Sequence, residues 1–327
     1  MKEDKYVVTL VSEEGKNGVA DSSVFDKIIG QEEASRKLSF YIKSHSTETP
    51  FPTLLFTGSQ GLGKTYFAQK VANSLGRKLV EINCGSLEKR KDFIEGVLFE
   101  KVLGNECITL LLDESHKLPT PITTLLLSLL NPTESYCNKL TYKNWVIEYD
   151  FSKINVIFAT TDAHSMFRPL VNRCEEVYFN IYSNQELYKM LKFYLPDVSI
   201  KCNQKDLSYA CRGRGRDAFV LSQNIKRYCI MNHTKVLTEE GWKELKSIFS
   251  IHLKGLNAQE LGLLRVLEDS SPISCNNIAV RMGVNPQNVE SELEIRPREL
   301  GLIESGTRGR SLTEDGEIYL SLVGASC

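Results

Sequence analysis

The sequence contains no apolar run that approaches the length needed to cross a bilayer, which is about 20 residues. Its first residues, Met1 to Lys5, include two acids, whereas a signal peptide begins with basic residues and continues into an apolar core. Nine cysteines are scattered singly, with no Cys-x-x-Cys pair, a pattern that disfavours a disulfide framework and a zinc site. We therefore expect a cytoplasmic protein without a membrane partner.

A strong overall charge is also lacking, because the net charge of the 327 residues is −1. The charge differs along the chain, however. Residues 183–254 carry 13 Lys and Arg against 7 Asp and Glu, whereas residues 255–327 carry 6 Arg, no Lys and 11 Asp and Glu. Together with the motifs below, this change favours four parts: a tail over 1–22, an α/β core over 23–181, a helical domain over 182–254 and a C-terminal domain over 255–327.

Residues 58–65, Gly-Ser-Gln-Gly-Leu-Gly-Lys-Thr, form a glycine-rich turn between an apolar run at 53–56 and an amphipathic helix at 66–75. In this context backbone N–H groups can surround an anion at the positive end of the helix. Lys64 is expected to reach the β- and γ-phosphates, and Thr65 to hold Mg²⁺. The predicted nucleotide contacts in this stretch are Gly58, Gly61, Leu62, Gly63, Lys64, Thr65 and Tyr66.

A second motif is the nearly continuous apolar run at 108–112, which ends in Asp113 and Glu114. Such a run is typical of a central parallel strand, and ligands in parallel sheets bind beyond the carboxyl ends of the strands. We expect Asp113 to bind Mg²⁺ and Glu114 to polarise the water that attacks the γ-phosphate. The alternative is that both acids cap a helix before Pro119; the phosphate loop favours the catalytic interpretation.

Two more candidates follow from their places along the chain. The strand predicted at 155–159 ends in Thr160 and Thr161, and Thr161 could sense the γ-phosphate. Arg173 closes a segment that resembles the AAA+ segment in which an arginine reaches the neighbouring subunit's γ-phosphate; Arg168 suits this role less well, and a surface ion pair is the alternative for a lone arginine.

Two further candidates lie outside these central motifs, one in the predicted helical domain and one near the N-terminus. Arg216, at a predicted helix start, could fold over the nucleotide as a second sensor. For the neighbouring Arg212 and Arg214, solvated arginines on a loop are at least as good an interpretation. Near the N-terminus, the Ile29-Gly30-Gln31 turn resembles the adenine-side segment of AAA+ ATPases, so Ile29 is a predicted nucleotide contact.

The last part of the chain has the pattern of a winged helix. A cap at 257–260 begins an apolar helix, residues 278–284 and 286–300 have helix-turn-helix spacing, and residues 302–313 read as a β-wing. Arg308 and Arg310 lie at the wing's glycine-rich tip and are predicted to contact DNA phosphates. Because this part is acidic, docking of a protein is the alternative.

The order of these motifs resembles an AAA+ module with an appended winged helix, and most of all the RuvB family of Holliday-junction branch-migration motors. The resemblance runs from about residue 25 to residue 320. It implies an α/β fold: a P-loop core with a parallel sheet, a helical lid and a C-terminal winged helix. It also implies ATP and Mg²⁺ as cofactors, a homo-oligomeric ring that would be a hexamer, double-stranded or branched DNA as a partner, and a junction-binding partner protein.

The sequence departs from the family pattern at several positions. Asp162 stands where the family has arginine, Val171 where a basic residue is expected, and Gly215 where proline usually precedes the sensor arginine. The stretch 131–150, read as a hairpin or an extended excursion, corresponds to the hairpin that docks the partner in the family but shares little sequence with it. The partner could therefore differ from that of the family.

Three other functions compete with the motor. Asn172-Arg173-Cys174 also resembles a clamp-loader segment, although clamp loaders end in a helical collar and not in a wing. An initiator ATPase also combines an AAA+ core with a winged helix and would bind DNA statically. A nucleotide-controlled protein-interaction switch would use the acidic winged helix to dock a protein, and its lack of salt-dependent DNA binding would distinguish it.

Overall fold

The computed structural model of the protein describes residues 6–9, 25, 27–46, 49–104, 107–130, 137–143, 145–150 and 154–324. The chain divides into two compact units, Met1–Ile181 and Tyr182–Cys327, and each is considered separately. Among the described residues, no helix combines the length and apolarity that spanning a membrane requires.

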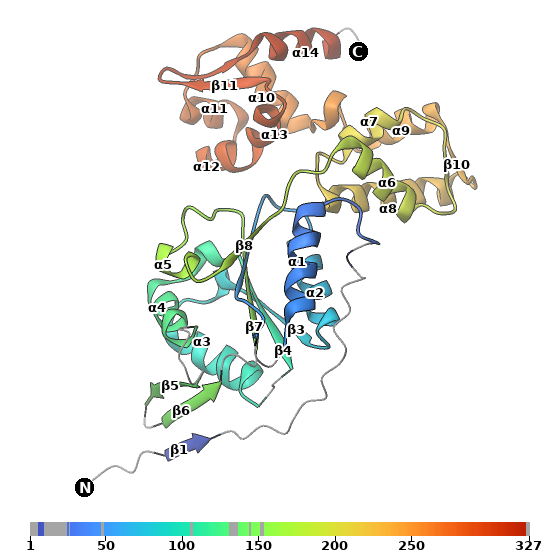
Figure 1. Ribbon diagram of the computed structural model, residues 1–327. Helices are drawn as coiled ribbons and strands as arrows, with labels where there is room; N and C mark the ends of the chain where they lie inside the picture. The colour runs from blue at the N-terminus through green and yellow to red at the C-terminus, as the bar shows by residue number, and fades with distance from the viewer. Residues whose placement is uncertain are drawn as a thin grey trace. The chain divides into compact units, whose positions relative to one another are not determined.

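The first unit is built on a five-stranded parallel sheet with the strand order β3-β4-β7-β2-β8 (Figure 1). All six residues of β7 and the first five of β4 are buried, as expected for strands covered on both faces. The predicted parallel α/β core is therefore confirmed. The strands are β2 (Leu54–Thr57), β3 (Lys78–Asn83), β4 (Ile108–Asp113), β7 (Asn155–Thr160) and β8 (Glu175–Tyr178).

Helices cover both faces of this sheet, with α1 and α2 on one side and α3 and α4 on the other (Figure 1). Side chains of η3 and α4 pack with β4 and β7 in one apolar core. The predicted helix after the phosphate loop is confirmed but begins two residues earlier, at Lys64. The helices are α1 (Glu32–Ser44), α2 (Lys64–Ser74), α3 (Arg90–Phe93), the π-helix η3 (Ile94–Val102), α4 (Thr120–Leu129) and α5 (Arg168–Val171).

A small three-stranded sheet accompanies the core. Strands β5 (Cys137–Tyr142) and β6 (Trp145–Asp150) form an antiparallel hairpin, and β1 (Tyr6–Thr9) pairs with β6 in parallel. The Tyr142 hydroxyl donates a hydrogen bond to Glu95 Oε1 at 2.8 Å, which fixes the hairpin to η3. Of the two structures expected for 131–150, the hairpin is confirmed. The rest of the tail expected over 1–22 lies outside the described residues.

The first part of the second unit is helical, as expected. Its helices are α6 (Asn184–Tyr194), α7 (Gln204–Ala210), α8 (Gly215–Met231) and α9 (Glu239–Ile248), joined by the short parallel pair β9 (Ser199–Ile200) and β10 (Val236–Leu237). Trp242 is fully buried, and its indole N–H donates to Asp206 Oδ2 at 2.8 Å. Tyr182 joins this unit through its N–H, which donates to the Gly213 carbonyl at 3.0 Å.

The remaining part of the second unit is a winged helix. After η6 (Leu253–Gly255), helices α10 (Ala258–Asp269) and α11 (Cys275–Met282) precede a helical stretch formed by α12 (Pro286–Asn288), η7 (Val289–Leu293) and α13 (Ile295–Glu299). The hairpin of β11 (Ile303–Gly306) and β12 (Gly309–Leu312) leads to α14 (Glu314–Gly324). The predicted helix-turn-helix and wing are therefore both present.

Candidate nucleotide-binding site

The phosphate loop joins β2 to α2 and has a backbone that only glycine accommodates easily. Gly58, Gly61 and Gly63 have φ angles of 142°, 76° and 100°, in the region that side chains with a Cβ rarely adopt. At Gly58 a Cβ would also lie 2.5 Å from the Phe179 carbonyl oxygen. The loop thus passes directly against the residue that follows β8, so a glycine at position 58 has a steric cause.

Lys64 is the first residue of α2, and its side chain turns back into the loop. The ammonium group donates to the carbonyl oxygens of Gly58 at 2.6 Å and Ser59 at 2.9 Å, and the residue is 8% exposed. A positive charge inside a glycine-rich loop at a helix N-terminus fits the triphosphate of ATP. Thr65 follows on the first turn of α2, whereas Tyr66 is largely exposed, with Lys70 Nζ 5.2 Å from its ring centroid.

The two acids lie at the carboxyl edge of the sheet, as predicted. Asp113 ends β4 level with Asn83 of β3, and its Oδ1 accepts the N–H of Glu114 at 2.9 Å. Glu114 has a φ of 53°. Its carboxylate accepts from Lys117 Nζ at 2.6 Å, and this hydrogen bond is the main cause of the lowered pKa of Glu114. Sequence reasoning did not single out Lys117.

The two threonines that end β7 have different surroundings. Thr160 is buried and pairs in register with Thr57, the last residue before the phosphate loop. Its hydroxyl lies 2.9 Å from His116 Nδ1 and accepts the N–H of Asp162 at 3.0 Å. Thr161 is exposed at the end of the strand. The role predicted for Thr161 stays a prediction, while Thr160 links this strand end to the turn after β4.

Asp162, which stands where the family has arginine, is held by hydrogen bonds within the turn that follows Thr161. Asp162 accepts the N–H groups of His164 at 3.1 Å and Ser165 at 3.2 Å, and it also accepts from the Ser165 hydroxyl. These hydrogen bonds lower the pKa of Asp162, with those from Ser165 contributing most. Asp162 thus stabilises the turn locally. Val171, a second departure from the family pattern, is partly buried and packs against the apolar core.

Arg173 is exposed and follows α5. Its Nη1 donates to the Leu127 carbonyl at 2.5 Å, near the end of α4, so within one subunit it caps that helix. Arg168 Nη2 lies 3.4 Å from His164 Nδ1. The role predicted for Arg173 concerns a neighbouring subunit and stays a prediction.

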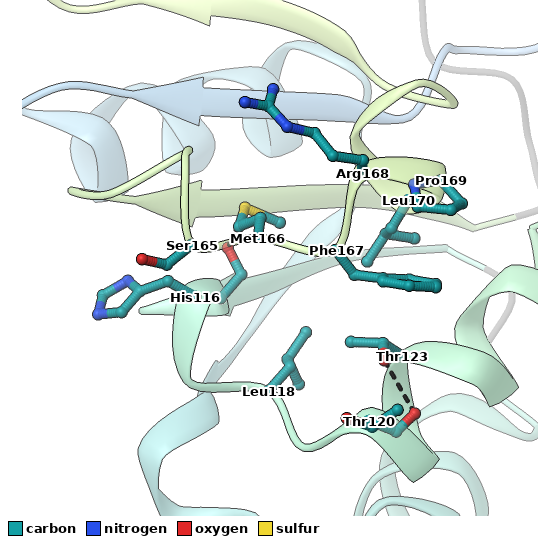
Figure 2. A pocket seen from close by; sticks show the side chains of 11 residues that line it. His116, Leu118, Thr120, Thr123, Ser165, Met166, Phe167, Arg168, Pro169 and Leu170 are labelled. Carbon is teal, nitrogen blue, oxygen red and sulfur yellow. Dashed lines mark hydrogen bonds between the residues drawn. The ribbon is translucent and has the colours of Figure 1, made fainter.

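A pocket of about 460 Å³ lies between the turn after β4 and the segment that contains α5 (Figure 2). His116 and Ser165 come from these two segments, and Met166, Phe167 and Leu118 add apolar surface. No residue of the phosphate loop lines this pocket. It therefore adjoins the predicted catalytic acids and the arginine segment without being the phosphate site itself.

In the turn that is predicted to contact the adenine, the side chain of Gln31 forms two hydrogen bonds with the backbone of Asn180. Its Nε2 donates to the Asn180 carbonyl at 2.6 Å, and its Oε1 accepts the Asn180 N–H at 2.9 Å. The residue is buried with a φ of 56°. This pairing fixes the Ile29-Gly30-Gln31 turn, while the contact predicted between Ile29 and the nucleotide stays a prediction.

The arginine-rich loop lies in the second unit and differs from the expectation at one point. Arg212 is not solvated: its Nη1 donates to Glu260 Oε2 at 3.0 Å and its Nη2 to Glu260 Oε1, and Glu260 is 1% exposed. Arg214 Nη2 lies 3.9 Å from Glu299 Oε1. Arg216 is exposed on the first turn of α8, and Gly215 is the first residue of that helix, the position where proline fits best. The sensor role of Arg216 stays a prediction.

The two wing arginines also differ from each other. Arg308 is exposed in the turn between β11 and β12. Arg310 is 18% exposed; its Nε donates to Glu294 Oε1 at 2.8 Å and its Nη2 to Glu290 Oε1 at 2.6 Å. These two carboxylates hold Arg310 against the helical stretch, so Arg308 is the better placed of the two for a phosphate.

Comparison with known proteins identifies related domains in both units. Residues 54–181 match the family model "ATPase family associated with various cellular activities (AAA)", and residues 253–321 match "RuvB C-terminal winged helix domain". The chain is 25% identical over 305 residues to the Holliday junction branch migration complex subunit RuvB of Mycoplasma genitalium, covering 91% of this chain and 96% of the relative. The protein of the same name from a Wolbachia of Drosophila simulans is 26% identical over 307 residues, covering 91% and 93%.

Solved structures agree on the fold. The structure described as the Thermotoga maritima RuvB Holliday junction branch migration motor superposes with a TM-score of 0.75 at 21% identity, covering 93% of this chain and 98% of that one. A mutant of the same protein gives a TM-score of 0.76 at 22% identity. At this identity the likeness supports the fold alone.

Proposed function

The chain belongs to the RuvB family of AAA ATPases, and on that premise we propose that it is an ATP-hydrolysing, ring-forming motor that moves duplex DNA or migrates Holliday junctions. The observation that supports this most is the convergence at one sheet edge. The phosphate loop follows β2, and Asp113 ends β4, two strands away in the same parallel sheet. A RuvB-type winged helix then follows on the same chain.

In the proposed site each residue has one task. The loop of Gly58 to Gly63 surrounds the phosphates, and Lys64 leaves its carbonyl partners to bind the β- and γ-phosphates. Thr65 and Asp113 would hold Mg²⁺, which offsets charge that develops on the phosphates. Glu114 accepts the proton of the water that attacks the γ-phosphorus.

The remaining residues make hydrolysis depend on assembly. Arg173 leaves the Leu127 carbonyl and completes the site of the next subunit, where its guanidinium contacts two oxygens of the transferring phosphoryl group. Thr161 and Arg216 sense the γ-phosphate from the strand end and from the lid. A homo-oligomeric ring, hexameric by the resemblance, follows from a site shared between two subunits.

The DNA contact is assigned to the wing tip. Arg308 is exposed there, whereas residues 255–327 are acidic overall, so local charge and not net charge would attract phosphates. In the same proposal the hairpin of β5 and β6 docks a junction-binding partner protein. The acidity of the winged helix also supports a second candidate function, a nucleotide-controlled switch that docks a protein.

The test is the ATPase rate without DNA, with linear duplex and with a four-way junction. We expect DNA to stimulate ATP hydrolysis by the native protein. Glu114→Gln should lower the ATPase rate at least about 100-fold, and Arg173→Ala should lower it about 1000-fold or more. Arg168→Ala is the matched control, because it removes an exposed arginine of the same segment. Mixing the Glu114 and Arg173 variants should restore part of the activity, since each supplies what the other lacks.

Two results would separate the candidates. If none of the DNA substrates changes the ATPase rate but hydrolysis still requires Arg173, the switch would be favoured over the motor. Activity that survives Arg173→Ala, or a mixture of the two variants that stays inactive, would refute a site shared between subunits.

A further inference from the structure

Strand β6 has a neighbour on each of its two edges. Strand β5 pairs antiparallel with one edge, and the N-terminal strand β1 pairs in parallel with the other, with Tyr6 opposite Trp145 and Thr9 opposite Glu148 (Figure 1). A strand edge without a neighbour leaves a row of backbone N–H and C=O groups unpaired. Residues 6–9 therefore cover an edge of β6 that would otherwise be free to take another strand.

The segment that covers this edge has the composition of a strand but cannot form a sheet alone. Residues 6–9 are Tyr-Val-Val-Thr, and their partners in the register, 145–148, are Trp-Val-Ile-Glu. All but the glutamate are aromatic or β-branched, the types that favour strands. The flanking residues 2–5 are all charged, and residues 12–15 are Ser-Glu-Glu-Gly. Even a two-stranded hairpin is only marginally stable in water, so the strand at 6–9 depends on β6.

The hairpin of β5 and β6 is held by contacts from β5 and from the hairpin turn. The Tyr142 hydroxyl donates to Glu95 Oε1 at 2.8 Å, Lys143 Nζ donates to the same oxygen at 2.7 Å, and the Tyr142 ring centroid lies 6.0 Å from that of Phe99. Leu140 of β5 is 7% exposed and belongs to the apolar core. Because β1 supplies none of these contacts, β6 can keep its place when β1 leaves.

The covalent connection determines how strongly β1 competes for this edge. The strand ends at Thr9, and the next described residue is Phe25, so the intervening residues span at most about 50 Å. A tether of this order gives the attached segment an effective concentration of about 1 mM at the edge. A separate peptide of the same chemistry must compete with that concentration.

We propose that the free edge of β6 is a strand-addition site for an extended peptide segment of a partner protein, and that residues 6–9 of the same chain close it until the peptide displaces them. The segment that fits has a run of four aromatic or β-branched residues and adds in parallel, as β1 does. Backbone hydrogen bonds would supply the affinity. The inference goes beyond the proposed motor function, because strand addition is tested with a peptide alone and without ATP.

The test uses the full chain with the double substitution Val7→Pro and Val8→Pro. Proline lacks the N–H that a ladder requires, and two successive positions ensure that one of the lost groups faces β6. The matched control carries Lys16→Pro and Asn17→Pro, two prolines in the same tail but outside β1. The probe is a fluorescently labelled peptide with the sequence of residues 4–12, and its binding is followed by fluorescence anisotropy.

We expect the Val7 and Val8 variant to bind the probe about tenfold more tightly than the native protein does. This factor follows if the probe has a Kd of about 0.1 mM and competes with about 1 mM of tethered strand. The control variant should bind like the native protein. A probe in which both valines are replaced by proline should bind to neither.

A second readout is hydrogen exchange of the backbone amides in residues 145–150, measured by mass spectrometry. The Val7 and Val8 variant should exchange faster than the native protein at those amides that face β1, and added probe should restore their protection. Dilution of the native protein should leave this protection unchanged, because both strands belong to one chain.

The outcomes decide the proposal. If the Val7 and Val8 variant keeps the native urea midpoint but neither binds the probe more tightly nor exchanges faster in β6, the strand-addition site is refuted. Protection that is lost on dilution would overturn closure by the same chain and assign β1 to a second copy. A chain that begins at residue 13 provides the same comparison if the double proline variant fails to fold. Probe binding as expected in a protein without ATPase activity would refute the motor and leave this site standing.

Discussion

Replacing Arg212 with alanine is expected to destabilise the second unit by more than a loop position suggests. Both terminal nitrogens of Arg212 donate to Glu260, which is 1% exposed. Without the guanidinium, a buried carboxylate loses its counter-charge, which costs about 3–5 kcal/mol. An exposed ion pair contributes at most about 1 kcal/mol. The structure therefore predicts that Arg212→Ala lowers the unfolding free energy by about 3–5 kcal/mol, and not by the smaller amount expected for an exposed pair.

The matched control removes the charge but keeps the shape. Glu260→Gln retains an oxygen that can accept the N–H of Asn257, now bonded to Glu260 Oε2 at 2.9 Å, so the cap of α10 survives. The double variant of Arg212→Ala and Glu260→Gln buries no charge. We expect it to be more stable than Arg212→Ala alone, because the penalty lies in the unpaired charge and not in the lost contact.

The assay is urea unfolding of the full chain at neutral pH, followed by tryptophan fluorescence. The sequence has two tryptophans, and Trp242 lies buried in α9 of the second unit. A Trp145→Phe background therefore makes Trp242 the reporter of that unit. A loss below about 1 kcal/mol for Arg212→Ala, or a double variant less stable than that single one, would refute the buried ion pair.

Two further predictions concern the phosphate loop and the wing. Gly58→Ala should weaken ATP binding, measured by calorimetry, at least about tenfold, because the φ at this position is strained for any residue with a Cβ and that atom would meet the Phe179 carbonyl. The control is Gly76→Ala, at a position with a φ of 63° and nothing near its Cβ. This control should leave ATP binding unchanged and lower the unfolding free energy by only about 1–2 kcal/mol. Arg308→Ala should reduce the salt dependence of DNA binding by about one phosphate contact, whereas Arg310→Ala should mainly destabilise the winged helix; an equal loss of DNA affinity in both variants would contradict this assignment.

Local signals in the sequence were sufficient for most of the elements around the site. The strand before the phosphate loop, the apolar strand ending in Asp113 and the cap at Asn257 each depend on residues close together in the chain. The Asn257 prediction is confirmed in detail, because its side chain accepts the Glu260 N–H at 2.8 Å. These features were predictable because hydrogen bonding and burial there follow from spacing alone.

Features that depend on distant pairing were missed. Strand β8 begins with two glutamates, so its sequence does not have the apolar pattern of a strand in the sheet. In the structure Lys37 of α1 donates a hydrogen bond to the Glu176 carbonyl of this edge strand at 2.7 Å. Arg212 pairs with Glu260, which is 48 positions away in the sequence. The residues near Arg212 give no sign of this partner, so its loop pattern suggested a solvated arginine. The pair of Glu114 and Lys117 is different, because a spacing of three residues could have revealed it.

The pairing of Gln31 with Asn180 also determines where the chain can bend. Asn180 is bonded through both its N–H and its carbonyl to the first unit, and Tyr182 is bonded through its N–H to Gly213 of the second. Ile181 alone lies between these two anchored residues. Any reorientation that the polypeptide itself transmits from the first unit to the second is therefore concentrated in the few torsion angles around one residue, so the connection can act as a short hinge and not as a long flexible linker.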